Sequence, residues 1–382
     1  MRIAVLLEDR CKPNSPAFMY LQKYSGQCGA ECIQVEGNKC KILESACPPC
    51  LIRAKHCPGD AVKIINLPQE LDHDLTHCYG ENSFRLFRLP APREREVVGI
   101  LGANGIGKST AINLLSGTLR PNLGDWLSGE RPWDEVLETF PRGELRDFMT
   151  LVADNGVRIA VKPQYVDKIP KAFDGLVSAL LERIDQRGVI EQVSKDLAID
   201  HLFDRNLPDL SGGELQRVAI AATLLKDADV YFFDEPSSYL DIYERMRMVK
   251  IIQELSETGK RVIVIEHDLA ILDVLCDLVH IVYGERAAYG IFTPPRNTRT
   301  AINAYLDGFL EMENIRIRDT PIRFVRGGVR GEEIGQPILE WGDLEKTLGD
   351  FHLKTESGKV HSSEVVGVVG PNATGKTTMV KM

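Results

Sequence analysis

Short apolar runs without polar alternation recur along the chain and predict strands that are buried on both faces. Such runs cover 96–101, 229–233 and 261–265. Strands of this kind are typical of mostly parallel sheets with helices on both sides. Apolar residues at helical spacing occur at 110–119 and at 133–149. In the second range Pro-Arg-Gly at 141–143 interrupts the spacing, which predicts two short helices joined by a turn. The pattern therefore predicts an α/β domain.

One strand-loop-helix pattern occurs twice. The sequence Glu96-Val-Val-Gly-Ile-Leu-Gly102 and its loop return as Glu364-Val-Val-Gly-Val-Val-Gly370, 268 residues further along the chain. Each copy predicts an apolar strand, a glycine-rich loop and the start of a helix. The chain stops at Met382, soon after the second copy. A single strand and a short helix cannot bury a core, so we expect the chain to be part of a longer protein with two such domains.

Both loops fit the pattern G-x-x-x-x-G-K-[ST] that binds nucleotide phosphates. The glycines let backbone N–H groups converge on the phosphates, and the following helix N-terminus adds partial positive charge. The lysine reaches the outer phosphates and the hydroxyl binds Mg²⁺. The predicted ATP-binding residues are Gly102, Asn104, Gly105, Gly107, Lys108, Ser109 and Thr110 in the first loop, and Gly370, Asn372, Gly375, Lys376, Thr377 and Thr378 in the second.

Two acids follow the predicted strand at 229–233. Asp234 is suited to support the Mg²⁺ shell, and Glu235 to polarise the attacking water as a general base. Ser211-Gly212-Gly213-Glu214 places a hydroxyl and small residues at a predicted helix N-terminus, which is a second anion site. His267 follows the predicted strand at 261–265 and can contact a γ-phosphate.

The order of these motifs resembles an ATP-binding-cassette nucleotide-binding domain. More closely, Lys162-Pro-Gln164-Tyr-Val-Asp-Lys-Ile-Pro-Lys-Ala172, Asp234-Glu-Pro-Ser-Ser-Tyr-Leu-Asp241 and the cysteine-rich start are similar to the ABC subfamily E ribosome-recycling factor, the RNase L inhibitor family. The resemblance covers essentially the whole chain. It implies a small ferredoxin-like cysteine-rich domain over 1–75, a first cassette over 76–292 with a helix-loop-helix insertion at about 130–150, a hinge over 293–335, and the start of a second cassette over 336–382.

The resemblance also implies roles for single residues. Gln164 is expected to couple the binding of Mg²⁺ and the attacking water to domain motion. Glu235 and His267 are expected to be the other catalytic residues. The motif Ser211–Glu214 and the residue Asp241 are expected to face a nucleotide held by the opposite cassette. Tyr79 and Phe84 match aromatics that pack on adenine, although core packing explains them equally well. Ser109, Gln164 and Asp234 are the implied Mg²⁺ ligands.

Composition and charge narrow the functional classes. The 382 residues are 43% hydrophobic and 26% charged, a globular balance that excludes a disordered or fibrous protein. No apolar run approaches eighteen residues, so the sequence predicts no membrane span. The net charge of -9 argues against a protein that coats nucleic acid by bulk charge. With no secretion signal, we expect a cytoplasmic, reducing environment.

Seven of the nine cysteines lie in the first 57 residues, and a reducing compartment favours metal over disulfides for such a cluster. The cluster departs from the ferredoxin pattern, because Arg53 stands at the third ligand position of the run Cys47-Pro-Pro-Cys50 to Cys57-Pro58. The alternatives are one [4Fe–4S] cluster or two with unusual ligands, a zinc ion, or a metal-free fold. The resemblance slightly favours an iron–sulfur cluster, but not the full two-cluster set. The candidate ligands are Cys11, Cys28, Cys32, Cys40, Cys47, Cys50 and Cys57.

Two arginine clusters suggest contact with phosphates. One lies in the expected hinge and the other just before the first phosphate loop. In a ribosome-binding family such clusters are suited to rRNA. The members are Arg316, Arg318, Arg323, Arg326 and Arg330 in the hinge, and Arg85, Arg88, Arg93 and Arg95 before the loop.

The resemblance implies a cytosolic ATPase that splits ribosomes after termination and stays on the small subunit. The implied partners are the ribosome, chiefly its small subunit and rRNA, a release factor or its relative, and initiation factors, with no membrane. Head-to-tail pairing of two cassettes would leave this chain with half of each ATP site, so we expect it to be poorly active alone. An ATPase subunit of a membrane transporter and a nucleotide-gated iron–sulfur electron carrier are the alternative classes.

Overall fold

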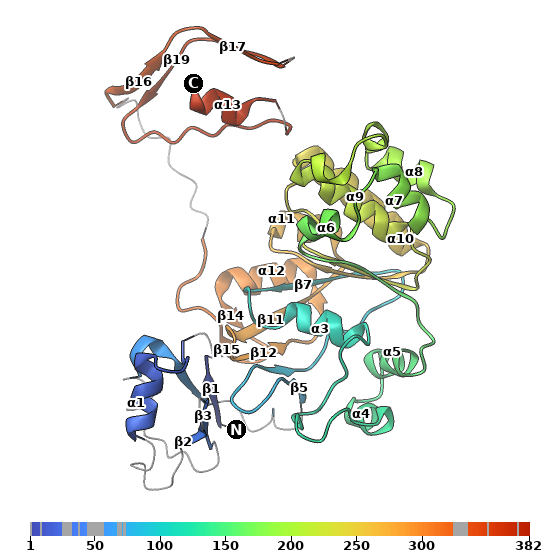
Figure 1. The fold of residues 1–382 in the computed structure, drawn as a ribbon, viewed down its shortest axis with the longest axis vertical. Coiled ribbons are helices and arrows are strands. Elements are labelled where there is room, and N and C mark those ends of the chain that lie inside the picture. The colour runs from blue at the N-terminus through green and yellow to red at the C-terminus, as the bar shows by residue number, and fades with distance from the viewer. Residues whose placement is uncertain are drawn as a thin grey trace.

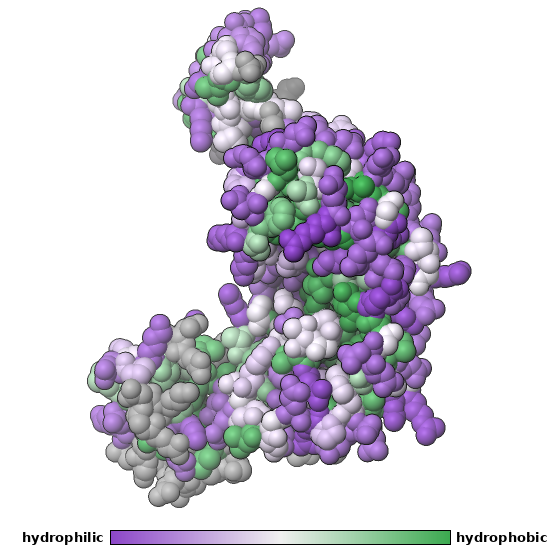
Figure 2. All heavy atoms as spheres, turned by 45° about the vertical axis from the view of Figure 1, so that its right-hand side comes forward, coloured by the Kyte–Doolittle hydropathy of each residue, from purple (hydrophilic) through white to green (hydrophobic). Residues whose placement is uncertain are grey.

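The computed structural model describes residues 2–7, 10–24, 33–36, 39–43, 57–66, 71, 74–323, 335–349, 351–372 and 374–382. Within them an N-terminal module, a large cassette and a C-terminal segment follow one another along the chain (Figure 1). The described helices lack the length and apolar character that crossing a membrane requires. Hydrophilic residues cover most of the visible face of the cassette (Figure 2).

The N-terminal module consists of two short antiparallel strand pairs and one helix. β1 pairs antiparallel with β4, and β2 pairs antiparallel with β3. Ala17 and Leu21 of the helix α1 pack with Ile33 and Ile42 of the strands in a small separate core. The elements are β1 (Arg2–Leu6), α1 (Pro16–Tyr24), β2 (Ile33–Glu36), β3 (Lys39–Ile42), η1 (Pro58–Asp60) and β4 (Val62–Asn66).

The cassette is built on a nine-stranded sheet in the order β5-β6-β12-β11-β7-β10-β9-β8, with β13 paired to β11. The five strands from β11 to β8 are parallel, and antiparallel pairs occur at the β5 end and around β11. The strands are β5 (Leu75–Cys78), β6 (Arg85–Phe87), β7 (Val97–Gly102), β8 (Ile159–Lys162), β9 (Val230–Asp234), β10 (Arg261–Ile265), β11 (Leu278–Glu285), β12 (Tyr289–Phe292) and β13 (Arg296–Asn297).

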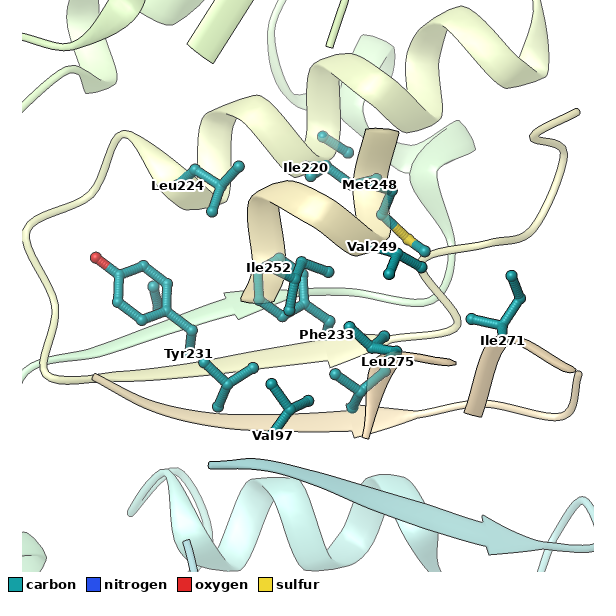
Figure 3. Close-up of a cluster of buried hydrophobic side chains, with 14 of the residues drawn as sticks. Val97, Ile220, Leu224, Tyr231, Phe233, Met248, Val249, Ile252, Ile271 and Leu275 are labelled. Atoms are coloured by element: carbon teal, nitrogen blue, oxygen red, sulfur yellow. The ribbon is translucent and has the colours of Figure 1, made fainter. Parts of the chain in front are cut away.

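The apolar runs explain why the central strands form. Every residue of β7 and β9 is buried, as the absence of alternation predicted. Figure 3 shows side chains of α9, α10 and α11 packed over the sheet, where Ile220, Met248 and Ile252 meet Tyr231 and Phe233. A second core on the other face joins β7, β9 and β10 to α3, α4 and α5. The sheet is therefore covered on both sides, which confirms the expected α/β fold.

Helices lie in the connections between the strands of the sheet. α4 and α5 flank the turn at 140–143, as the helical spacing of 133–149 predicted. The helices are α3 (Lys108–Leu115), α4 (Trp133–Thr139), α5 (Glu144–Ala153), η3 (Val166–Lys168), α6 (Ile169–Ala172), α7 (Val177–Ile184), α8 (Ile190–Asp196), η4 (Asp200–Leu202), η5 (Leu207–Asp209), α9 (Gly212–Leu224), α10 (Ile242–Glu257), α11 (Leu269–Leu275) and α12 (Thr298–Asp307).

The start of the expected hinge carries regular structure. α12, β14 (Phe309–Leu310) and β15 (Ile315–Arg316) follow β13, and Ala301 and Leu310 join the large core of the cassette. Arg296 forms a buried ion pair with Glu313 that ties this region to β13. A composition rich in Pro, Arg and Gly did not reveal this packing, because apolar residues at wide spacing carry it.

The C-terminal segment contains β16 (Pro337–Trp341), β17 (Leu344–Leu348), β18 (Phe351–Thr355), β19 (Gly358–His361) and α13 (Lys376–Lys381). The strand predicted at 364–369 is wrong: this stretch is irregular, and Val365 and Val369 are 97% and 94% exposed. A strand needs neighbours that bond its edges, and none of the described residues pairs with this stretch.

Candidate nucleotide site

The first glycine loop connects β7 to α3 at the carboxyl end of the parallel strands. Gly107 has φ +96°, and a Cβ atom there would lie 2.6 Å from Cζ of Phe84. Both the left-handed backbone and the close ring exclude other residues. The Nζ atom of Lys108 donates hydrogen bonds to the carbonyls of Gly102 and Ala103, each at 2.8 Å. The loop therefore curls around the lysine that the motif provides.

Burial sets the charge state of this lysine. Desolvation lowers the pKa of Lys108 to about 8, against the raising effect of Asp234 and Glu235. Lys108 therefore still carries most of its charge at neutral pH. A positive group that the loop holds in this position is well suited to attract phosphate oxygens.

The acidic pair lies beside the loop. Ser109 Oγ donates to Asp234 Oδ2 at 3.2 Å, which brings the two implied Mg²⁺ ligands together. Burial raises the pKa of Asp234. The next residue, Glu235, has its Oε1 atom 2.6 Å from Gln164 Nε2 and 3.5 Å from His267 Nε2. Three segments distant in the sequence thus meet at one carboxylate.

His267 is set up as a neutral imidazole. Burial lowers its pKa, and the nearby Lys108 lowers it further, while Glu235 raises it. A neutral ring can accept or donate one hydrogen bond according to its tautomer. Ser238 Oγ also lies 3.3 Å from Glu235 Oε2, so both carboxylate oxygens have partners. This arrangement holds a carboxylate at the edge of the phosphate loop, where it could accept a proton from water.

An open cleft of about 460 Å³ unites most of these groups. The aromatic rings of Tyr79 and Phe84, with centroids 6.5 Å apart, form one wall, and Tyr79 Oη lies 3.2 Å from Thr110 Oγ1. The predicted residues that line the cleft are Tyr79, Phe84, Asn104, Gly105, Gly107, Lys108, Ser109, Thr110, Gln164, Asp234 and Glu235. Of the predicted residues outside it, Gly102 contacts Lys108 and His267 contacts Glu235.

The cleft also has walls that the motifs did not indicate. Tyr165, Arg286 and Ala287 line it, and Arg286 packs against Gly105. Tyr165 directly follows Gln164 in the motif at 162–172, so its neighbour in the sequence already indicated a place near the site. Arg286 lies in the turn between β11 and β12, far from any motif, and only the folded structure brings it to the cleft.

The Ser211–Glu214 motif lies away from this cleft, at the N-terminus of α9. Ser211 and Glu214 form a capping box, in which Ser211 N donates to Glu214 Oε2 at 2.7 Å. Asp241 caps α10 in the same way. Glu244 of α10 forms an ion pair with Arg217 of α9 at 3.1 Å, so the two caps belong to one rigid unit.

The second glycine loop meets this unit. Asn372 N donates to Asp241 Oδ2 at 2.9 Å, and Asn372 Nδ2 lies 3.2 Å from the Tyr239 carbonyl and 3.5 Å from a Cβ built on Gly213. Gly375 has φ +89°, and Lys376 Nζ donates to the Gly370 carbonyl at 2.8 Å. The loop thus repeats the local geometry of the first. Thr377 and Thr378 lie in the first turn of α13.

The cysteine module gives only part of the predicted ligand set. Cys11, Cys40 and Cys57 lie near one another, and burial and the neighbouring thiols raise the pKa of Cys40 to about 12. Cys28, Cys32, Cys47 and Cys50 lie outside the described residues, as does Arg53. Among the described side chains, no group of three or more His, Cys, Asp or Glu has a metal-binding arrangement. Three thiols alone are fewer than the four ligands that a [4Fe–4S] cluster or a structural zinc ion takes.

The arginine cluster before the first loop is largely used inside the cassette. Arg85 is buried, Arg88 Nη2 lies 2.7 Å from Asp74 Oδ2, and Arg93 Nε lies 2.7 Å from Glu144 Oε2. Two of these arginines thus share their charge with carboxylates, whereas Arg95 is exposed, and contact of this cluster with rRNA stays a prediction. In the hinge, Arg316 and Arg318 lie over Phe309 and Tyr305, and Arg326 and Arg330 fall outside the described residues.

The parallel sheet, the phosphate loop and the acids that end β9 define the class of ATP-binding-cassette nucleotide-binding domains. The family model described as ABC transporter matches residues 92–238. A putative ABC transporter ATP-binding protein of Geobacter sulfurreducens is 32% identical over 219 residues, 56% of this chain and 83% of that protein.

The chain belongs to this class, and along its whole length it is similar to members of ABC subfamily E. It is 41% identical to ABC transporter E family member 1 of Arabidopsis thaliana and 39% identical to translation initiation factor RLI1 of Saccharomyces cerevisiae, in both cases over the whole of this chain and 64% of the relative. The structure matches a model of ribosome-bound archaeal Pelota and ABCE1 with a TM-score of 0.95 and 45% identity, over all of this chain and 65% of that one. The chain thus spans slightly less than two thirds of the length of these relatives.

Proposed function

We propose that this protein hydrolyses ATP and uses the reaction to split ribosomes into subunits after termination. The observation that carries the hydrolytic part is the convergence of Gln164 and His267 on the Glu235 carboxylate, beside the loop of Lys108. The ribosomal part is supported by two relatives, of which one is named as an initiation factor and the other is ribosome-bound together with Pelota.

In the proposed reaction, water attacks the γ-phosphorus of ATP and the bond to the β-phosphate oxygen breaks. Glu235 accepts the proton of the water, and the products are ADP and inorganic phosphate. Lys108 and the backbone N–H groups of the loop bind the phosphates, while Gln164 orients the water and Glu235. Ser109, Asp234 and Gln164 would hold Mg²⁺, which would offset charge on the phosphate oxygens; the hydrogen bond between Ser109 and Asp234 supports this set.

The second loop suggests how the chemistry drives movement. Asn372 bonds to Asp241 and Tyr239 and lies close to Gly213, so the second phosphate loop lies beside the Ser211–Glu214 motif. ATP bound between a phosphate loop and the opposite Ser-Gly-Gly-Glu motif would contact both cassettes and favour the closed state. We propose that closure moves the N-terminal module against the ribosome, and that hydrolysis resets it on the small subunit.

The proposed partners follow from the same interpretation. They are the ribosome with its small-subunit rRNA, a release factor or its relative, and initiation factors, all in the cytoplasm. Arg316, Arg318 and Arg323 are the described hinge arginines that could approach rRNA phosphates. An iron–sulfur cluster in the cysteine module stays a prediction, and no step of the proposed reaction depends on it.

The test uses the full-length protein with ribosomes of the same organism. Phosphate release should require Mg²⁺ and should rise when ribosomes are added, and the protein should cosediment with small subunits in the presence of a non-hydrolysable ATP analogue. Activity that responds to membranes with transport subunits, and not to ribosomes, would assign the protein to the transporter class instead.

A further inference from the structure

The ammonium group of a fully buried lysine lies directly behind the two acids of the site. Lys162 is the last residue of β8, where it pairs with Phe233 of β9, and none of its surface is exposed. Its Nζ atom donates to the carbonyl oxygens of Asp234 at 2.9 Å and Glu235 at 3.3 Å. A buried amine is costly unless it is paired, so these contacts fix both partners.

A second buried side chain, from a different element, bonds to the same turn. Gln216 of α9 is fully buried, and its Nε2 atom donates to the carbonyls of Glu235 at 2.9 Å and Pro236 at 2.8 Å. The Glu235 carbonyl therefore accepts hydrogen bonds from Lys162 and Gln216 together. Side chains from β8 and α9 thus clamp three consecutive carbonyls of the turn after β9.

The clamped backbone is in a conformation that a glutamate rarely adopts. Glu235 has φ +48°, in the left-handed region that disfavours residues with a Cβ atom. That conformation turns the Glu235 side chain toward Gln164 and His267. Without its carbonyl partners the turn could relax, and the carboxylate would lose its position relative to the phosphate loop.

The charge of Lys162 also faces the acids of the site. Asp234, Glu235 and Glu266 all raise its pKa, while the larger effect of burial lowers it to about 8. Glu266 in turn accepts a hydrogen bond from Ser237 N at 2.8 Å, on the far side of the same turn. One positive group thus lies among three carboxylates and limits their mutual repulsion.

We propose that Lys162 is a positioning residue for ATP hydrolysis, which, together with Gln216, holds the backbone of Asp234 and Glu235 so that the Glu235 carboxylate meets the attacking water. The inference rests on the proposed ATPase function and adds a residue to it. Lys162 is not one of the residues that line the cleft. It therefore acts on the rate of the chemical step and leaves ATP affinity nearly unchanged.

The test compares three full-length variants in steady-state phosphate release and in binding of a fluorescent ATP analogue. Lys162→Met keeps the length of the side chain and removes its donors and charge. Gln216→Leu removes the other clamp without changing charge. Lys250→Met makes the same change as the first variant on the surface of α10, where the side chain is 76% exposed.

We expect Lys162→Met and Gln216→Leu each to lower kcat at least tenfold, with KM and the analogue Kd within threefold of the wild type. Lys250→Met should change none of these values. If Lys162→Met unfolds, Gln216→Leu alone decides by the same criterion. Folded variants with kcat within twofold of the wild type would overturn the proposal.

Loss of analogue binding in folded forms of both clamp variants would overturn it as well, because the clamp would then serve ATP binding and not the chemical step. Failure of the proposed function is a different result: the wild-type protein itself would release no phosphate in the presence of Mg²⁺ and ribosomes.

Discussion

Asn82 joins the N-terminal module to the wall of the nucleotide cleft, and its removal should loosen the module. The residue is buried in the turn between Tyr79 and Phe84. Its Oδ1 atom accepts from Ile42 N at 2.7 Å, and its Nδ2 atom donates to the Ile42 carbonyl at 3.0 Å. Leu6 N also donates to the Asn82 carbonyl at 3.0 Å. The change that isolates the side chain is Asn82→Gly, because φ +55° suits glycine.

The magnitude follows from the two side-chain hydrogen bonds. Their loss leaves a buried N–H and a buried C=O of Ile42 without these partners, and a buried unsatisfied group costs about 1–3 kcal/mol. Water that enters the gap recovers part of this cost. We therefore expect local opening of β3 to become about 1.5–3 kcal/mol easier, or roughly 10- to 150-fold more frequent.

Hydrogen exchange of backbone amides in the intact protein measures this directly. The Ile42 amide should exchange faster by that factor, while amides of β9 and β10 should keep their protection. Asn155→Gly is the matched control, since Asn155 also has positive φ (54°) and is exposed. Equal exchange at Ile42 in the wild type and in both variants would refute the claim that Asn82 anchors the module.

The remaining predictions concern the site. Glu235→Gln should lower ATP turnover by about 10²–10⁴-fold and leave ATP affinity unchanged, as phosphate release and calorimetry can check; unchanged turnover would exclude Glu235 as the base. Tyr79→Ala should weaken ATP binding by about 1 kcal/mol or more, whereas a ring that only packs in the core would cost stability instead. Because the pKa of Lys108 lies near 8, ATP affinity should be constant below pH 7 and fall as the pH rises through 8; a flat profile from pH 7 to 9 would contradict this. The full-length protein purified without oxygen should contain iron and acid-labile sulfide in near-equal amounts, and zinc or no metal would refute the cluster prediction.

The local sequence was sufficient to predict those parts of the site in which the chemistry requires a fixed spacing of residues. The loop of Lys108 needs its glycines and its following helix in one continuous stretch, so the motif alone located it. The strands β7, β9 and β10, in which apolar and polar residues do not alternate, were equally predictable, because burial on both faces requires a continuous apolar run.

Tertiary packing decided what the sequence missed. Lys162 looks like an ordinary charged residue in the sequence, and only pairing of β8 with β9 brings it behind the acids. Arg85 and Arg88 suggest a basic patch, yet one is buried and the other is paired with Asp74. The apolar run at 364–369 satisfies strand propensity but has no paired neighbour among the described residues. For Lys162 and Arg88 the deciding partner lies elsewhere in the sequence, and for the run at 364–369 the missing partner decides the outcome.

Ribosome splitting by the full-length protein is the most direct measurement of the central claim. Purified ribosomes are incubated with the protein, a release factor and ATP with Mg²⁺, and are then resolved by sedimentation. We expect conversion to subunits with ATP and none with ADP, and the Glu235→Gln variant should fail to repeat the cycle on excess ribosomes. Intact ribosomes in a reaction where the wild-type protein hydrolyses ATP would contradict the account.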